Sequence, residues 1–142
     1  MPRMSYVDDA HAPLRVRKEH YLEAIYSLGD GVTLSRLARA LSVKPSSALK
    51  VVRELEAEGL VTYGGRKGLR LTEAGRRRVE DLNQRHKTLE EFFRLIGVAP
   101  EEAFREAEKL EHVISPEVVR RIEKLNEALK KMRGVLAGDE GV

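Results

Sequence analysis

Hydrophobic positions recur with a helical period along most of the chain, at i, i+3 and i+4 spacing. This pattern predicts helices over 13–28, 33–41, 45–58, 72–97, 100–114 and 116–134. Two short apolar stretches, 60–63 and 69–71, flank a glycine-rich tip at 64–68 and predict a β-hairpin. The predicted fold is therefore mainly α-helical with one small hairpin.

The ends of the predicted helices carry recognisable signals. Thr33 and Thr72 stand where N-caps are expected, and Pro45 and Pro116 suit the first position of a helix. The order helix, short helix, turn, helix, hairpin is that of a winged helix-turn-helix. We therefore predict a winged helix-turn-helix DNA-binding domain over residues 1–75 and an all-helical domain over 76–142.

Charge is distributed unevenly between these two parts. Residues 15–78 contain 14 lysines and arginines against 7 acidic residues, whereas residues 79–142 contain 11 against 14. A basic first part and an acidic second part favour nucleic acid as the partner of the first and a cation or another subunit as the partner of the second.

Composition narrows the kinds of metal site that the protein can form and the cellular locations that are expected for it. The 142 residues include no cysteine, so disulfides and thiolate metal sites are excluded and any metal must use nitrogen and oxygen ligands. The chain contains no run of about 18 apolar residues, and residues 1–14 lack a hydrophobic signal core. We therefore predict a cytoplasmic protein without membrane association.

The second helix of the helix-turn-helix is expected to enter the major groove with its N-terminal residues. The hydroxyls, amines and guanidinium groups there, and those at the hairpin tip, suit phosphates and base edges of double-stranded DNA. The predicted DNA-binding residues are Lys44, Ser46, Ser47, Lys50, Arg53, Arg66 and Lys67. Alternatively, these residues form only a solvated scaffold for protein docking.

Three of the four histidines have a carboxylate at helical spacing, on three different predicted helices. The pairs are His20 with Glu23, His86 with Glu90, and His112 with Glu108 and Glu111. A solvated ion pair accounts for any one of them, but their recurrence on separate helices favours a shared site. Imidazole and carboxylate ligands without thiolate suit Mn²⁺, Fe²⁺, Co²⁺ or Zn²⁺.

Several blocks of the chain resemble the diphtheria-toxin-repressor family of metal-dependent transcriptional regulators. They include EHYLEAIYSL, KPSSALKVVRELEAEGLV, RKGLRLTEAGRR, QRHKTLEEFFRLIGV and EAEKLEHVISPEVVRRIEKL, and they extend over residues 17–128. The resemblance implies a homodimer, with a helical metal-binding and dimerisation domain after the DNA-binding domain and with operator binding activated by a divalent metal. It assigns ligand roles to Glu23, His86, Glu108, Glu111 and His112.

The resemblance is nearest to the manganese-sensing branch of that family. Glu108 stands where the iron-sensing branch has cysteine, and the length leaves no room for the SH3-like third domain of that branch. His20 departs from both branches, which have aspartate or methionine there, so all four metals remain open. Phe104 replaces an ancillary-site histidine of the iron branch, which favours a solvated role for Glu90. The dimer-face candidates are Leu89, Phe92, Phe93, Leu95 and Ile96.

The sequence therefore predicts a metal-dependent transcriptional repressor that controls metal uptake or homeostasis. Its expected metal ligands are His20, Glu23, His86, Glu108, Glu111 and His112, with Mn²⁺ or Fe²⁺ favoured as the ion. One alternative is a winged-helix regulator without metal dependence. A metalloenzyme is disfavoured, because no HExxH motif, nucleophile–histidine pair or phosphate-cradling loop is evident.

Overall fold

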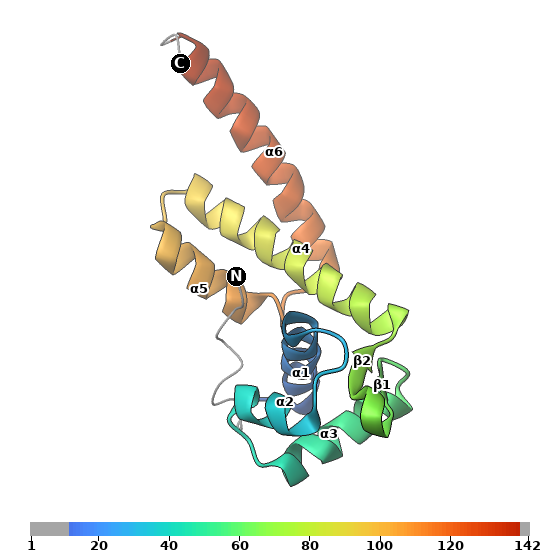
Figure 1. Ribbon diagram of the computed structural model, residues 1–142. Coiled ribbons are helices and arrows are strands. Elements are labelled where there is room, and N and C mark those ends of the chain that lie inside the picture. Colours follow the sequence, from blue (N-terminus) through green and yellow to red (C-terminus); the bar gives the residue numbers. More distant parts are fainter. Residues whose placement is uncertain (1–11, 140–142) are drawn as a thin grey trace. The chain divides into compact units, whose positions relative to one another are not determined.

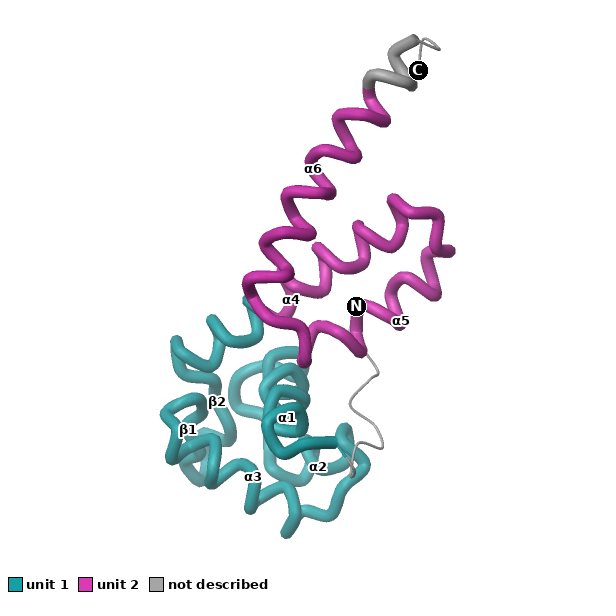
Figure 2. Tube along the Cα trace, turned by 180° about the vertical axis from the view of Figure 1, so that it is seen from behind, with its two compact units in different colours: residues 1–81 teal, residues 82–142 magenta. Residues whose placement is uncertain are grey.

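The computed structural model describes residues 12–139 and forms two compact units, residues 1–81 and 82–142, joined within one long helix (Figures 1 and 2). The described helices are α1 (Leu14–Leu28), α2 (Leu34–Leu41), α3 (Pro45–Ala57), α4 (Glu73–Leu95), α5 (Pro100–Leu110) and α6 (Pro116–Asp139). The strands are β1 (Val61–Tyr63) and β2 (Leu69–Leu71), and a short 3₁₀ helix, η1 (Gly65–Lys67), lies between them. The predicted mainly helical fold with one hairpin is confirmed.

The first unit is built around one apolar core to which α1, α2, α3 and both strands contribute. Leu22 and Ile25 of α1 are buried there with Leu37 of α2 and with Val52 and Leu55 of α3. Each of these residues occupies the apolar stripe of its own helix, so the helical period of the sequence is the period of the buried face. The core fixes α3 against α1 and α2 as in a helix-turn-helix.

The hairpin is a short antiparallel ladder that pairs Val61 with Leu71 and Tyr63 with Leu69. A further antiparallel bridge joins Val32 to Leu69, and the Leu69 amide donates to the Val32 carbonyl at 2.9 Å. The loop before α2 therefore extends the hairpin on one side. Gly68 lies at this crossing with φ 66° and ψ −154°, and a Cβ there would be 2.5 Å from the Gly31 carbonyl oxygen. Only glycine fits this position.

The start of α4 is attached to the first unit by hydrogen bonds. The Thr72 hydroxyl accepts from the Gly75 amide at 3.1 Å and donates to the Gly59 carbonyl at 2.7 Å. The Thr72 amide donates to the Leu60 carbonyl at 3.0 Å. One threonine therefore caps α4, as predicted, and also holds it against the turn between α3 and β1.

The second unit consists of the later part of α4 together with α5 and α6. The Asn126 side-chain amide donates to the Thr88 carbonyl at 3.0 Å, and Lys130 lies 3.3 Å from Glu91, so α6 packs along α4. The C-terminal part of α6 extends beyond the ends of α4 and α5 in both views (Figures 1 and 2). Leu89 is buried, which assigns this predicted dimer-face candidate to the core of the subunit.

The two last helices differ in length from the prediction. α5 ends at Leu110 rather than at residue 114, and residues 111–113 form a turn in which the Val113 and Ile114 amides both donate to the Leu110 carbonyl. α6 continues through Gly134 to Asp139, because a lone glycine weakens a helix by about 1 kcal/mol without ending it.

No helix among residues 12–139 combines the length and the apolar character that crossing a bilayer requires. The predicted absence of a signal core concerns residues 1–14, most of which lie outside the described residues.

Candidate metal centre and DNA-binding face

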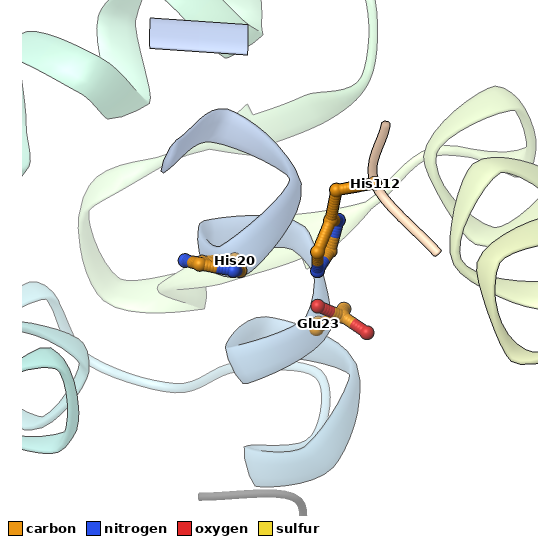
Figure 3. Close-up of side chains that lie close together, drawn as sticks. All are labelled: His20, Glu23 and His112. Atoms are coloured by element: carbon orange, nitrogen blue, oxygen red, sulfur yellow. The ribbon is translucent and has the colours of Figure 1, made fainter. Parts of the chain in front are cut away.

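Two predicted ligands of the first unit, His20 and Glu23, lie one turn apart on α1, and both are buried (Figure 3). Between them, Tyr21 and Leu22 belong to the apolar core. Packing on one side of α1 therefore fixes the direction in which the imidazole and the carboxylate project. The pKa of the Tyr21 phenol lies above its ordinary value. Burial raises this pKa by more than the nearby positive charge of Arg17 lowers it.

Ion pairs attach α1 to its neighbours in the first unit. Glu19 is almost completely buried, and its carboxylate accepts from Arg78 Nε of α4 at 3.1 Å. Lys18 donates to Glu58 at 2.7 Å, and this hydrogen bond raises the pKa of the lysine. Buried carboxylates require a partner, so the Glu19–Arg78 contact contributes to the placement of the helix that carries His20 and Glu23.

In the second unit, a histidine of α4 contacts a carboxylate that follows α5. His86 Nδ1 is 2.8 Å from Glu111 Oε1, and His112 Nε2 is 3.7 Å from the other oxygen of the same carboxylate. His86, Glu111 and His112 are all buried. The structure thus brings these three predicted ligands together within one unit.

Glu111 and His112 lie in the turn after α5, and hydrogen bonds fix the backbone there. The Glu111 amide donates to the Ala107 carbonyl at 3.0 Å, which continues the helical ladder for one residue. Arg85 of α4 donates to the Glu111 carbonyl at 3.4 Å. The sequence analysis missed Arg85, because its contact joins residues that are 26 positions apart.

The surroundings of His86 correct the prediction for Glu90. Glu90 Oε1 lies 3.3 Å from His86 Nε2, so this carboxylate faces the imidazole and is only partly exposed, not simply solvated. The Phe104 ring meets the imidazole edge-on, with centroids 4.6 Å apart. His86 therefore has a carboxylate at each ring nitrogen and an aromatic ring beside it.

Glu108 provides a test of whether these residues suit a cation. Its Oε2 atom is buried and makes no hydrogen bond to any described residue. A buried carboxylate oxygen without a donor is costly, and a bound cation relieves that cost. The other predicted ligands offer imidazole nitrogens and carboxylate oxygens, which suit a divalent first-row metal.

The residues predicted to bind DNA lie on the first unit. The predicted residues at the start of α3, Lys44, Ser46, Ser47 and Lys50, are all exposed, as are Arg66 and Lys67 of η1. Arg53 lies 3.0 Å from Glu56 and 5.4 Å from the centre of the Tyr63 ring.

Arg70 is a further exposed cation of the hairpin, which the sequence analysis missed. It lines an open groove of about 450 Å³ together with Thr62, Tyr63 and Lys67. The alternation Leu-Arg-Leu in β2 would have indicated it, because the middle residue must face away from the two buried leucines.

Comparisons with known proteins agree with this architecture. Residues 14–69 match the model of the iron dependent repressor N-terminal DNA binding domain, and residues 72–132 match that of its metal binding and dimerisation domain. The HTH-type transcriptional regulator MntR of Geobacillus kaustophilus (strain HTA426) is 41% identical over 73% of this chain and 76% of its own length. MntR of Lysinibacillus sphaericus (strain C3-41) is 38% identical over 80% and 84%.

Among solved structures, ScaR with bound Zn²⁺ is 34% identical with a TM-score of 0.70, over 78% of this chain and 53% of that protein. The chain thus corresponds to about half of ScaR. These names are those of transcriptional regulators and not of enzymes, and the family's second domain is a dimerisation domain. The chain belongs to the diphtheria-toxin-repressor family of metal-dependent transcriptional regulators and is a DNA-binding repressor whose activity depends on a metal ion.

Proposed function

We propose that a divalent metal ion activates operator binding by a homodimer of this chain, which then represses genes of metal uptake or homeostasis in the cytoplasm. Residues 1–75 would form the DNA-binding domain and residues 76–142 the metal-binding and dimerisation domain. The ligands would be His20, Glu23, His86, Glu108, Glu111 and His112.

The burial of ionisable side chains carries this proposal. Five of the six proposed ligands are among the buried polar or charged residues, and the sixth, Glu108, has a buried oxygen without a hydrogen-bond donor. Proteins bury imidazoles and carboxylates when these groups are paired with one another or bind a metal. This group of buried imidazoles and carboxylates therefore supports a cation-binding site over an ion-pair network with a purely structural role.

The donor set narrows the choice of metal. It lacks thiolate and combines imidazole with carboxylate, which suits Mn²⁺, Fe²⁺, Co²⁺ and Zn²⁺. The similarity to MntR regulators supports Mn²⁺ or Fe²⁺. Glu108, at the position that distinguishes the two branches in the resemblance, favours Mn²⁺ of the two. His20 gives the site one more nitrogen donor than an aspartate would, which strengthens binding of Zn²⁺ and Co²⁺ relative to Mn²⁺.

Residues around the site also hold its ligands in place. His86 contacts Glu111 through one ring nitrogen and Glu90 through the other. When one nitrogen of a histidine binds a metal, a carboxylate at the other fixes the tautomer and the orientation of the ring. The bound ion would supply the positive charge that allows several carboxylates to share one buried site.

The first unit connects the ligand helix to the DNA-binding face. α1, which carries His20 and Glu23, contacts α2, α3 and β2. A constraint on α1 therefore acts on α3 and on the hairpin through the shared core. In a dimer, this would set the separation of two α3 helices to about 34–36 Å, the spacing of successive major-groove half-sites.

The side chains proposed to contact DNA supply mostly cationic and hydroxyl groups. Lys44, Ser46, Ser47 and Lys50 would meet the duplex from α3, with Arg66 and Lys67 along the backbone from the hairpin. Arg53 would join them from the solvent-exposed face of α3. Much of the affinity would then come from phosphate contacts and fall steeply as salt is raised.

DNA binding by chelated protein, titrated separately with Mn²⁺, Fe²⁺, Co²⁺ and Zn²⁺, tests the proposed function. We expect the chelated protein to bind its operator weakly and at least one of the ions to tighten binding by 10-fold or more, on the order of a typical allosteric coupling. Fluorescence anisotropy at fixed ionic strength measures the effect. Equal operator affinity with and without each ion would refute metal activation.

Calorimetric metal titration of the His20→Ala and His20→Asp variants tests the predicted ligand that the resemblance to the family does not account for. We expect His20→Ala to weaken metal binding by about 10–100-fold, the loss typical for an important group at a metal site. His20→Asp should restore Mn²⁺ binding more than Zn²⁺ binding, because it replaces nitrogen with oxygen. Unchanged stoichiometry and affinity in His20→Ala would show that His20 is not a ligand.

A further inference from the structure

A glutamate stands at the end of the row of α3 residues that are proposed to contact DNA. Ser46, Lys50 and Arg53 follow one another at intervals of four and three, so they share one exposed face of the helix. Glu56 continues the same row at the next interval of three. A carboxylate on a face that meets a polyanion opposes binding by charge repulsion, so its presence there needs a separate physical reason.

Both carboxylate oxygens of Glu56 accept a hydrogen bond, each from a different element. Arg53 Nη1 of α3 donates to Oε1 at 3.0 Å, and the Tyr63 amide of β1 donates to Oε2 at 3.4 Å. The Arg53 guanidinium also lies over the Tyr63 ring, 5.4 Å from its centre. These three residues therefore join α3 to the strand that packs beside it (Figure 1).

Tyr63 is the fixed end of these contacts. It pairs with Leu69 across the hairpin, and its side chain packs against the apolar core of the first unit. The Arg53 side chain, in contrast, is 58% exposed, and a long side chain at such a position has many rotamers to choose from. Glu56 and the Tyr63 ring hold its guanidinium beside the hairpin. A charge that is already placed loses less conformational entropy when it binds a phosphate.

The surroundings of Glu56 differ from those of the neighbouring glutamates. Glu54 and Glu58 lie 3.6 Å and 2.7 Å from Lys18, so they are on the side of α3 that faces α1. Glu56 instead lines the open groove beside the hairpin, where it is the one carboxylate among the described lining residues and the other charged residues are cations. An exposed ion pair within one helix contributes little by itself, but this carboxylate also binds the backbone of the hairpin.

We propose that Glu56 is a positioning residue for DNA binding: the Tyr63 amide anchors its carboxylate, which in turn orients the Arg53 guanidinium for a phosphate. This inference rests on the proposed placement of α3 at the duplex, but not on activation by metal. A glutamine at position 56 has one acceptor oxygen where the carboxylate uses two, so it cannot hold both donors. Charge alone predicts the opposite effect, because removing an acid from this face favours a polyanion. The sign of the change in affinity therefore distinguishes the two.

The Glu56→Gln variant of the full chain tests the role by fluorescence anisotropy, in chelator, with a mixed-sequence duplex of about 30 base pairs, or about three helical turns. We expect binding to weaken by about 5-fold at about 0.1 M salt, most of the roughly 8-fold that counterion release gives one phosphate contact there. Glu58→Gln is the matched control, because it removes the same charge at the C-terminal end of α3 and should leave binding unchanged or slightly tighter. Circular dichroism checks that both variants are folded. Equal or tighter binding by Glu56→Gln would overturn the proposal.

A double-mutant cycle separates positioning from a general loss of stability. In the Arg53→Gln background no guanidinium is left to orient, so Glu56→Gln should no longer weaken binding. A loss of the same size in both backgrounds would mean that Glu56 only stabilises the domain, and would overturn the proposal.

Lys50→Gln is the reference for the DNA-binding face. It should lower the slope of log K against log salt by about 1, as Arg53→Gln should. If both variants left this slope unchanged, the proposed placement of α3 would be wrong, and the positioning role with it. Because metal is absent throughout, these outcomes are independent of whether metal activates operator binding.

Discussion

The double variant Glu108→Ala/His112→Ala is expected to fold but to lose metal-dependent DNA binding. Glu108 lies in the last turn of α5 and His112 in the turn that follows it, and they would supply a carboxylate and an imidazole to the proposed metal site. Removing two donors should weaken metal binding by more than the 10–100-fold that loss of one supporting group costs. The metal-free fold should survive, because the buried oxygen of Glu108 makes no hydrogen bond to any described residue and His112 lies in a turn outside the apolar core of the first unit.

The measurement is operator affinity at saturating and at chelated metal, with thermal unfolding of the chelated protein in parallel. Glu106→Ala/Lys109→Ala is a matched control on the same helix, because it removes an exposed ion pair of 2.8 Å. Surface pairs of this kind contribute about 0–1 kcal/mol, so the control should keep both stability and metal response. If the double variant still bound DNA more tightly with metal, the ligand assignment at the end of α5 would be wrong.

The coupling between metal binding and operator binding must also appear in the other direction, as an effect of DNA on metal affinity. If metal tightens operator binding, operator DNA must tighten metal binding by the same factor, because the two equilibria share one thermodynamic cycle. The same reciprocity separates a metal-activated repressor from a protein in which the metal only stabilises the fold. In the second case, metal would raise the thermal unfolding temperature without changing operator affinity.

Local features of the fold were predictable from the sequence because their causes are local. The apolar period of each helix sets its buried face, and Thr33 caps α2 by accepting from the Arg36 amide at 3.1 Å. Pro45 stands at the first position of α3, as its fixed φ allows. The hairpin followed from two short apolar stretches around glycines. None of these features depends on residues that are distant in the chain.

Features that depend on distant residues were predicted incompletely. The spacing of Glu108, Glu111 and His112 indicated one helical face, yet α5 ends before Glu111, and the Glu111 carboxylate faces His86 from a turn. Similarly, nothing near Glu90 in the sequence distinguishes a solvated carboxylate from one that faces His86. Which pairs at helical spacing become buried depends on the tertiary packing of α4 against its neighbours.

Gly75→Ala is expected to destabilise the first unit strongly, by about 3 kcal/mol, the upper part of the range for overpacking. A Cβ at this position would overlap the Leu60 carbonyl oxygen and would lie 3.3 Å from Leu71 Cδ2. The carbonyl cannot move freely, because it accepts the Thr72 amide at 3.0 Å. The substitution must therefore separate α4 from the turn that leads into the hairpin, and operator binding should weaken along with stability.

Gly134→Ala is the control, because it makes the same substitution in another helix with nothing within 4 Å of the new Cβ. Alanine favours a helix over glycine by about 1 kcal/mol, so this variant should be neutral or more stable. Urea unfolding of both variants gives the two free energies, which we expect to have opposite signs. Equal stability of Gly75→Ala and the wild type would mean that α4 tolerates a side chain at its contact with Leu60. In that case, the close approach of these backbones would not be what fixes α4 to the DNA-binding unit.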